Sequence, residues 1–347
     1  MANTQDVLAQ LEKERRNVAF DAYDIIVRQL IDMVRNREID ISPDYQRQFI
    51  WKEKRESELI ESVFLGIPIP SLYMAVNQLD GTWEVVDGVQ RLSTLLHFVG
   101  APEFLARIDR PTPLRLEGLE KLSELNGVSF DELPAPAKAT FLNRGLRVTT
   151  LNDRSDFNVR FDLFERLNTG GVGLHDQEIR TILFRGDFNE ILKNLSNNTA
   201  FRNVVKLGAG KTASDYSECV LRFFAFLNEY MEFDHSVKEF LNGYMQRNLN
   251  GPSAADILLF EHTFSFLQSE LADGIKRNGR GSTPINLYEA IAVGTGLAIR
   301  ARHGENPVPG RVLPLLSNAE LRTFTSAGTN SRQMVRNRIE FVRDSLV

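Results

Sequence analysis

The sequence predicts an α+β protein, with a mixed N-terminal domain over residues 1–190 and an all-helical domain over residues 191–347. Two observations support this fold class. Three segments between residues 71 and 151 have the composition of strands, whereas from about residue 187 onward only helical spacing of apolar residues is found. With 347 residues, 42% of them hydrophobic, the chain is long enough for one large or two moderate cores.

The first elements precede these strands. Apolar residues over 22–37 recur with helical spacing and predict a helix. Residues 54–65 have the pattern of an amphipathic helix that ends at Gly66, shortly before Pro68 and Pro70. Residues 71–76 and 82–86 then predict two strands of a hairpin, because an Asp80-Gly81 turn separates them.

A turn at Asp87 leads from the second strand into a helix that ends near Gly100. Residues 101–135 are rich in proline, glycine and charge, which is typical of an insertion or loop, and a strand follows over 144–151. Further helices are predicted over 156–167, 176–184, 214–230, 236–247, 254–275, 284–302 and 330–346. No fixed-period repeat is present.

Residues 83–94 carry the pattern with the most chemical content. Gly88 allows a sharp turn, the next helix begins with N–H donors, Arg91 can grip phosphate with two donors, and Asp87 can hold a metal ion or orient water. The same residues also fit an ordinary strand–turn–helix connection, with Asp87 as a cap and Arg91 in a surface ion pair. Both interpretations stay open on this segment alone.

Two other segments accompany this turn. One runs from Ile41 through Tyr45, Gln46 and Arg47 to Trp51 and continues over 58–70; the other covers 161–174 and ends in Gln177-Glu178-Ile179-Arg180. Read in order, the three segments resemble the N-terminal domain family of GmrSD-type, modification-dependent restriction systems, over about residues 20–190. That family is assigned a ParB/sulfiredoxin-like fold.

The resemblance implies nucleotide binding and hydrolysis of a nucleoside triphosphate, with Mg²⁺, coupled to recognition of DNA in defence against foreign DNA. It implies Asp87, Gln90 and Arg91 as catalytic residues and Asp87 as the metal ligand. The nucleotide-binding residues would be Tyr45, Gln46, Arg47, Gly88, Arg91, Thr94, Asn168, Thr169, Gly170 and Gly171. The family's turn reads Asp-Gly-Gln-Gln-Arg, and Val89 replaces its first glutamine here, so a polar role of that side chain is lost.

Family members that cut DNA usually do so through a separate nuclease domain of the His-Asn-His type. The five histidines of this sequence are scattered without the paired spacing of such a centre, and Cys219, the sole cysteine, lies in an apolar helical run and is expected in the core. Three functions therefore stay open. They are a nucleoside triphosphatase, a non-hydrolysing nucleotide or DNA sensor that acts with a separate nuclease, and a metal-dependent nickase that uses Asp87 and Glu84.

The net charge of −5 is unevenly distributed. Residues 275–347 hold 11 Lys and Arg against 5 Asp and Glu, so this part is +6 and the rest of the chain is −11. Such a split is typical of a nucleic-acid-binding face, and equally of a surface that complements an acidic partner. The candidate DNA contacts are Lys276, Arg277, Arg280, Arg332 and Arg336.

Other features narrow the class of protein. No stretch approaches 18 apolar residues and residues 1–17 are polar and charged, so we expect a cytoplasmic protein without a membrane span. Residues 207–212 resemble a phosphate-binding P-loop, but Val205 stands where the first glycine is required. Lys211 is therefore expected in an ordinary loop.

Overall fold

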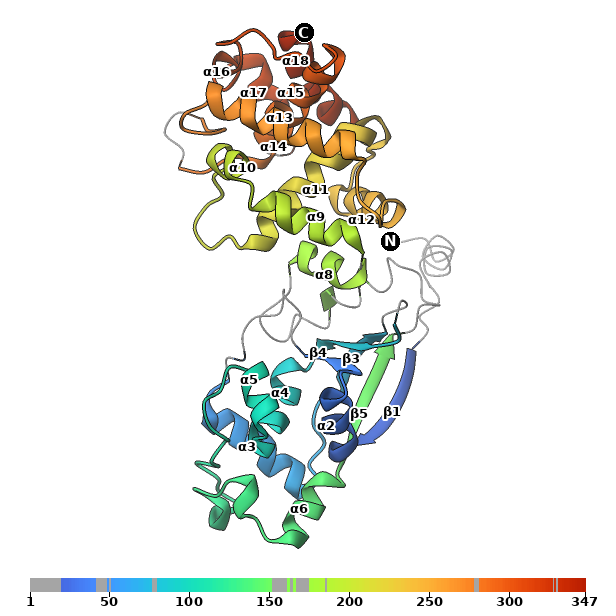
Figure 1. The fold of residues 1–347 in the computed structure, drawn as a ribbon, viewed down its shortest axis with the longest axis vertical. Coiled ribbons are helices and arrows are strands. Elements are labelled where there is room, and N and C mark those ends of the chain that lie inside the picture. Colours follow the sequence, from blue (N-terminus) through green and yellow to red (C-terminus); the bar gives the residue numbers. More distant parts are fainter. Residues whose placement is uncertain are drawn as a thin grey trace, which may run out of the picture. The chain divides into compact units, whose positions relative to one another are not determined.

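The structure, a computed structural model, describes residues 20–41, 49, 51–76, 80–151, 161–162, 165–166, 175–184, 186–277, 281–326, 328 and 330–347 (Figure 1). The chain forms two compact units, Met1–Leu174 and His175–Val347, which we call the N-terminal unit and the helical unit. The predicted boundary lay sixteen residues further on, at 190. Within the described part of the chain, no helix is long and apolar enough to cross a membrane.

The N-terminal unit is built on a five-stranded sheet in the order β1-β5-β3-β4-β2. Its strands are β1 (Phe20–Ile26), β2 (Ile39–Asp40), β3 (Leu72–Val76), β4 (Trp83–Asp87) and β5 (Gly145–Leu151). β3 and β4 pair antiparallel, as the hairpin signal predicts, while β5 pairs antiparallel with β1 and parallel with β3. The predicted strands at 71–76, 82–86 and 144–151 are thus confirmed to within one residue at each end.

The helices of this unit are α2 (Val27–Arg35), α3 (Glu53–Leu65), α4 (Val89–Val99), α5 (Pro102–Arg107) and α6 (Ala135–Leu142), with 3₁₀ turns η1 (Ser123–Leu125) and η2 (Phe130–Glu132). α3 and α4 both end at a glycine with left-handed backbone, Gly66 and Gly100, as the sequence predicts. Residues 101–135 are largely irregular apart from α5 and the two turns, but Leu114, Leu116 and Leu119 anchor them in the core.

The predicted helix over 22–37 is wrong for its first five residues. These belong to β1, which pairs residue by residue with β5 from Phe20–Leu151 to Ile26–Gly145, and the helix begins only at Val27. Ile25 and Ile26 are β-branched and suit either state, so pairing with a distant strand decides their conformation. The predicted helix over 156–167 lies mostly outside the described residues.

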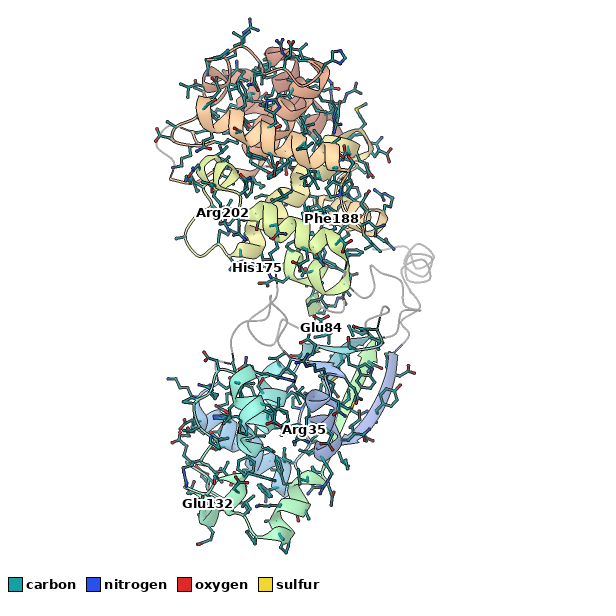
Figure 2. All side chains as sticks on the ribbon, viewed as in Figure 1. Arg35, Glu84, Glu132, His175, Phe188 and Arg202 are labelled. Carbon is teal, nitrogen blue, oxygen red and sulfur yellow. The ribbon has the colours of Figure 1, made fainter. Side chains whose placement is uncertain are left out.

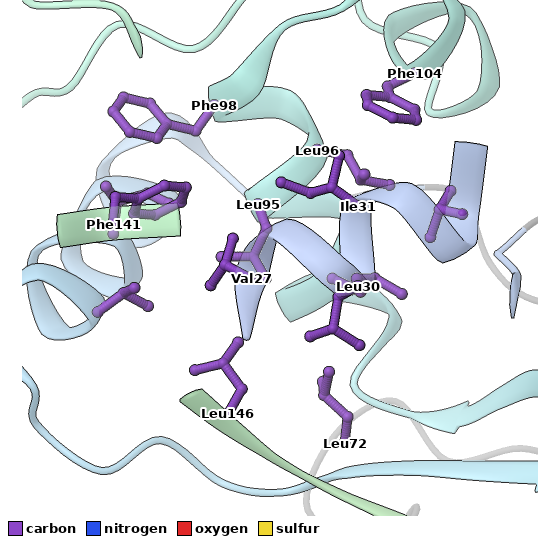
Figure 3. Packing of buried hydrophobic residues seen from close by; sticks show 14 of the residues in the cluster. Val27, Leu30, Ile31, Leu72, Leu95, Leu96, Phe98, Phe104, Phe141 and Leu146 are labelled. Atoms are coloured by element: carbon purple, nitrogen blue, oxygen red, sulfur yellow. The ribbon is translucent and has the colours of Figure 1, made fainter. Parts of the chain in front are cut away.

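The core of the N-terminal unit lies between the sheet and its helices. Figure 3 shows α2 residues Val27, Leu30 and Ile31 packed with Leu95 and Leu96 of α4, and with Leu72 and Leu146 from the strands. All of these side chains are buried. These apolar contacts therefore fix the position of α4 on the sheet, and with it the position of the turn that precedes α4.

The helical unit contains α8 (Asp176–Leu183), α9 (Asp187–Ser196), α10 (Thr199–Val204), α11 (Ala213–Glu229), α12 (Val237–Arg247), α13 (Ala254–Glu270), α14 (Ile285–Tyr288), α15 (Gly294–Ala301), α16 (Val312–Leu315), α17 (Ala319–Thr325) and α18 (Arg332–Leu346). A 3₁₀ turn, η4 (Tyr230–Glu232), follows α11, and a π-helical segment, η5 (Glu289–Val293), joins α14 to α15. The α+β class is confirmed. The ParB/sulfiredoxin-like assignment stays a prediction.

α11 is the central helix of this unit, with buried residues from Cys219 to Leu227. Aromatic rings from neighbouring helices surround it. The ring centres of Phe188 of α9, labelled in Figure 2, and Phe224 are 6.4 Å apart. The ring centres of Phe223 and Phe260 of α13 are 5.2 Å apart. Cys219 is buried as predicted, and burial raises the pKa of its thiol to about 12, so it is an inert core residue.

Candidate functional site

The turn between β4 and α4 has the geometry expected from its sequence. β4 ends at Asp87, Gly88 adopts a left-handed conformation with φ of +104°, and α4 starts at Val89 with no side-chain hydrogen bond to its cap. A Cβ at position 88 would lie 2.5 Å from Leu72 Cδ2 and 3.2 Å from Arg91 Nη2. Glycine is therefore needed here both for its backbone angle and for the close approach of these two side chains.

Arg91 folds back over this turn. Its Nη2 donates to Asp87 Oδ2 at 2.8 Å, and Arg91 is only 8% exposed, whereas 35% of the Asp87 side chain is exposed. No other hydrogen bond of the Arg91 side chain is found within the described residues. A guanidinium has five N–H donors, so this pair holds the group in place while it keeps further donors for an anion.

Two more predicted site residues lie on the first turns of α4. Gln90 Oε1 accepts a hydrogen bond from the backbone N–H of Trp51 at 3.2 Å, which joins α4 to the segment before α3. Thr94 is buried and its hydroxyl donates to the carbonyl of Gln90 at 2.8 Å. The Thr94 hydroxyl is therefore bonded within its own helix. Gln90 therefore connects the first turn of α4 to Trp51.

The other predicted nucleotide contacts lie outside the described residues. These are Tyr45, Gln46 and Arg47 in the first motif and Asn168, Thr169, Gly170 and Gly171 in the third. Of the predicted site residues in the N-terminal unit, the described part of the chain therefore includes five. Asp87, Gly88, Gln90 and Arg91 lie together at the turn, and Thr94 lies one helical turn further along α4.

A buried polar cluster between α3 and α4 was not predicted. Glu56 of α3 and His97 of α4 are both buried, with 2.6 Å between Glu56 Oε2 and His97 Nδ1. His97 Nε2 lies 2.9 Å from the carbonyl oxygen of Thr112, which only accepts, so Nε2 is the donor in this contact. Arg110 Nη2 approaches Glu56 Oε1 to 3.7 Å. These residues are far apart in the sequence, and no spacing rule connects them.

Arg110 also connects this cluster to the surface. Its Nη2 donates to the carbonyl oxygens of Phe49 and Trp51 at 3.3 and 2.9 Å, and its guanidinium lies 4.5 Å from the centre of the Phe49 ring. A shallow pocket of about 530 Å³ opens there, lined by Phe49, Trp51, Lys52, Glu53, Arg110 and Glu117. The Trp51–Gln90 hydrogen bond places this pocket beside the first turn of α4.

No group of three or more His, Cys, Asp or Glu side chains that suits a metal ion exists among the described residues. A dedicated protein cage for Mg²⁺ is thus not found in this part of the chain. Mg²⁺ bound with a nucleotide commonly takes only one or two carboxylates, together with phosphate oxygens. Asp87 can be such a carboxylate, because it is partly exposed and pairs with Arg91 through Oδ2.

Three of the four arginines considered for DNA contact lie in the described part of the chain, and each of these three has a partner. In α18, Arg336 pairs with Glu340 at 3.0 Å, and Arg332 lies 3.6 Å from Asp234 and donates to the carbonyl of Phe233. Arg277 donates to Thr325, Lys276 is half-buried, and Arg280 lies outside the described residues. Lys211 lies in the loop before α11, as expected, and pairs with Asp215 at 2.9 Å.

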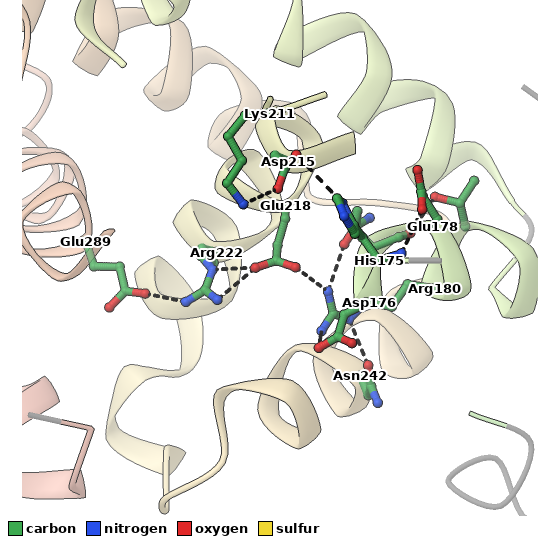
Figure 4. Close-up of polar contacts among 12 residues, drawn as sticks. His175, Asp176, Glu178, Arg180, Lys211, Asp215, Glu218, Arg222, Asn242 and Glu289 are labelled. Carbon is green, nitrogen blue, oxygen red and sulfur yellow. Dashed lines mark hydrogen bonds and ion pairs between the residues drawn. The ribbon is translucent and has the colours of Figure 1, made fainter. Parts of the chain in front are cut away.

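The helical unit also contains a chain of ion pairs that ties its helices together (Figure 4). Arg180 of α8 lies 3.0 Å from Glu218 of α11, Glu218 lies 2.7 Å from Arg222, and Arg222 lies 2.7 Å from Glu289 of the π-helical segment. Burial opposes ionisation of Glu218, but Arg222 and Arg180 outweigh it and lower its pKa to about 2. Arg180, part of the third motif, is therefore a structural residue here.

The family model of the GmrSD restriction endonuclease N-terminal domain matches residues 27–184. The match includes the turn at Asp87, the buried Glu56–His97 pair and helix α8. No curated protein matches the chain at a significant level. A restriction endonuclease family indicates a component of a DNA restriction or defence system that interacts with DNA. The resemblance carried by the three motifs is thus confirmed: residues 27–184 match the GmrSD N-terminal domain family.

Proposed function

We propose that the N-terminal unit binds a nucleoside triphosphate at the β4–α4 turn and hydrolyses it, as the nucleotide-dependent component of a restriction or defence system. The observation that carries this proposal is the Arg91 guanidinium, held by Asp87 over Gly88 at the start of a helix without a side-chain cap. A cation, a helix N-terminus and a flat glycine surface together favour an anion at one point.

The chemistry assigned to each residue follows from its position. Arg91 and the first turn of α4 hold the phosphate oxygens, and Arg91 neutralises the charge that develops on the transferring phosphoryl group. Gln90, whose side chain is oriented by Trp51, positions a water molecule. That water attacks the terminal phosphorus, the bond to the bridging oxygen breaks, and phosphate and a nucleoside diphosphate leave. Arg47 and the segment Asn168, Thr169, Gly170 and Gly171 supply further phosphate contacts in this proposal.

Mg²⁺ bound with the triphosphate would be held by Asp87 and phosphate oxygens, and would supply further neutralisation of charge. Asp87 has a second task, because it orients Arg91. Loss of either residue therefore affects the site in a different way.

A direct test compares nucleotide binding in wild type, Arg91→Ala and Asp87→Ala by equilibrium dialysis. Arg91→Ala is expected to abolish binding, while Asp87→Ala retains part of the binding and loses turnover. Unchanged binding in Arg91→Ala would contradict the proposal. Arg35, an exposed arginine of α2 that pairs with Asp32 and Glu103 (Figure 2), provides the matched control, and Arg35→Ala should bind as wild type does.

We also propose that DNA is cut by a nuclease centre outside these 347 residues, so that this chain senses or switches rather than cleaves. The five histidines lack the paired spacing of a His-Asn-His centre, and no acidic metal cluster exists in the described part of the chain. Plasmid incubated with the purified protein and Mg²⁺ should remain uncut. Cleavage that is lost in Asp87→Ala would support the nickase alternative instead.

A further inference from the structure

The shallow pocket beside α4 has the composition of a recognition site. Two aromatic rings, Phe49 and Trp51, line it together with Lys52, Glu53, Arg110 and Glu117. Its volume of about 530 Å³ is within the range of small-molecule sites. The face of an aromatic side chain can stack on any planar ring of a ligand. Carboxylate and ammonium groups can form hydrogen bonds with the donors and acceptors on the edge of that ring.

The aromatic residues of this pocket are held in place by cations. Arg110 stacks on the Phe49 ring at 4.5 Å and donates to the carbonyls of Phe49 and Trp51, and the guanidinium of Arg55 lies 4.4 Å from the centre of the Trp51 ring. Glu56, buried and paired with His97, lies 3.7 Å from Arg110 and balances its charge. Phe49 and Trp51 are therefore held by Arg110 of the buried cluster before any ligand arrives, which lowers the entropy cost of binding.

The pocket is joined to the proposed phosphate site by one hydrogen bond. The backbone N–H of Trp51 donates to Gln90 Oε1, and Gln90 directly precedes Arg91 in the first turn of α4. A ligand that places phosphate at Arg91 thus has a surface for a planar group next to it. Because this bond uses the backbone of Trp51, the indole ring can be removed without removing the donor.

We propose that this pocket binds the base of the nucleotide whose phosphates bind at the β4–α4 turn. The inference rests on the proposed function and extends it. The base stacks against Trp51 and Phe49, and Lys52, Glu53 and Glu117 contact its edge. Trp51 and Glu117 then determine which nucleotide is preferred, while Arg91 determines that a triphosphate is bound at all.

Fluorescence of Trp51 offers a direct test. The chain has two tryptophans, Trp51 and Trp83, so Trp83→Phe leaves Trp51 as the single reporter. ATP, GTP, CTP and UTP are added to this variant, and inorganic tripolyphosphate serves as a ligand with phosphates but no base. Nucleotides are expected to quench the Trp51 emission, whereas tripolyphosphate should compete with them for the site without quenching.

A second measurement separates stacking from folding. Trp51→Ala should weaken nucleotide binding roughly ten-fold, the size expected for loss of one stacked ring, and leave tripolyphosphate affinity within two-fold of wild type. Glu117→Gln should change the order of preference among the four nucleotides, because the Glu117 contact to Ser57 uses only its backbone N–H. Lys121→Ala, an exposed residue outside the pocket, is the control.

The outcomes are distinct. Equal weakening of nucleotide and tripolyphosphate binding by Trp51→Ala would assign Trp51 a structural role and overturn the inference, and so would nucleotide binding without quenching. In both cases the proposed function stands, because phosphate is still bound. If neither nucleotide nor tripolyphosphate binds the wild-type protein, the proposed function itself fails and the base pocket fails with it.

Discussion

Asp87 and Arg91 form the ion pair that spans the β4–α4 turn. They stand four residues apart in the sequence, and Arg91 Nη2 lies 2.8 Å from Asp87 Oδ2. Glu56, His97 and Arg110 form a second polar group, assembled from distant parts of the chain. Each is an ordinary polar residue of its segment, and only the packing of α3, α4 and the segment after α5 brings them into contact. The sequence gives no local signal for such a cluster.

Gly88 offers a test at the scale of one residue. Gly88→Ala should destabilise the protein by roughly 1–3 kcal/mol more than Gly81→Ala, since both positions have positive φ but only residue 88 lacks space for a Cβ. Thermal unfolding of the two variants measures the difference. Equal stability of the two variants would show that Leu72 moves aside and that the close approach at this turn is not required.

Glu56 offers a second test at this scale. Glu56→Ala leaves His97 and Arg110 without their buried carboxylate, and removal of one partner from a buried pair costs about 3–5 kcal/mol. Urea unfolding gives the free energy. Asp24→Ala, which breaks the exposed pair with Arg147 on the sheet, should have almost no effect. A small effect of Glu56→Ala would mean that water replaces the carboxylate.

Among the helices and strands, the elements predicted from local sequence pattern are found where tertiary packing favours the same conformation as the local pattern. The hairpin β3–β4 and the helices α3 and α4 end at the glycines and turns that the sequence indicates. β1 was missed because its strand state depends on β5, more than a hundred residues away. The helix predicted over 254–275 ends at Glu270, and the one over 284–302 contains a π-helical segment around the buried Glu289, which no periodicity shows.

The ion-pair chain in the helical unit predicts how stability depends on pH. The folded-state pKa of Glu218 is about 2, below its ordinary value of 4.5, so its contribution is fully present above about pH 4.5 and is lost as the pH falls toward 2. The contribution is at most on the order of 3 kcal/mol, because 23% of the side chain is exposed and solvent screens it. Glu218→Gln should flatten the unfolding free energy over this pH window. An unchanged slope would contradict the assignment.

Helix α18 provides the test of DNA contact. Arg332 and Arg336 have carboxylate neighbours, so each must exchange that contact for a phosphate when DNA binds. Loss of one phosphate contact lowers the slope of log K against log salt by about one. Arg336→Ala should therefore reduce this slope for non-specific duplex DNA if α18 contacts the backbone. An unchanged slope would exclude Arg336 from the DNA-binding face.

At the scale of the whole molecule, the chain combines two units with different construction, a mixed sheet with helices and an all-helical unit. The family match ends at residue 184 and so includes α8, which packs with α11 in the helical unit through Arg180 and Glu218. The third motif therefore spans the boundary between the units along the chain. The sequence pattern predicts a mixed α/β half followed by a helical half. The position of the boundary between them depends on the packing of α8, which cannot be read from the sequence.

The most direct test of the account is phosphate release from ATP, GTP, CTP and UTP with Mg²⁺, with and without DNA, for wild type, Arg91→Ala and the Arg35→Ala control. We expect turnover in wild type and in Arg35→Ala, with a preference among the four bases, and no turnover in Arg91→Ala. Turnover that persists in Arg91→Ala would contradict a nucleotide site at the β4–α4 turn. No turnover in wild type, with nucleotide still bound, would contradict hydrolysis and leave a sensor that acts without it.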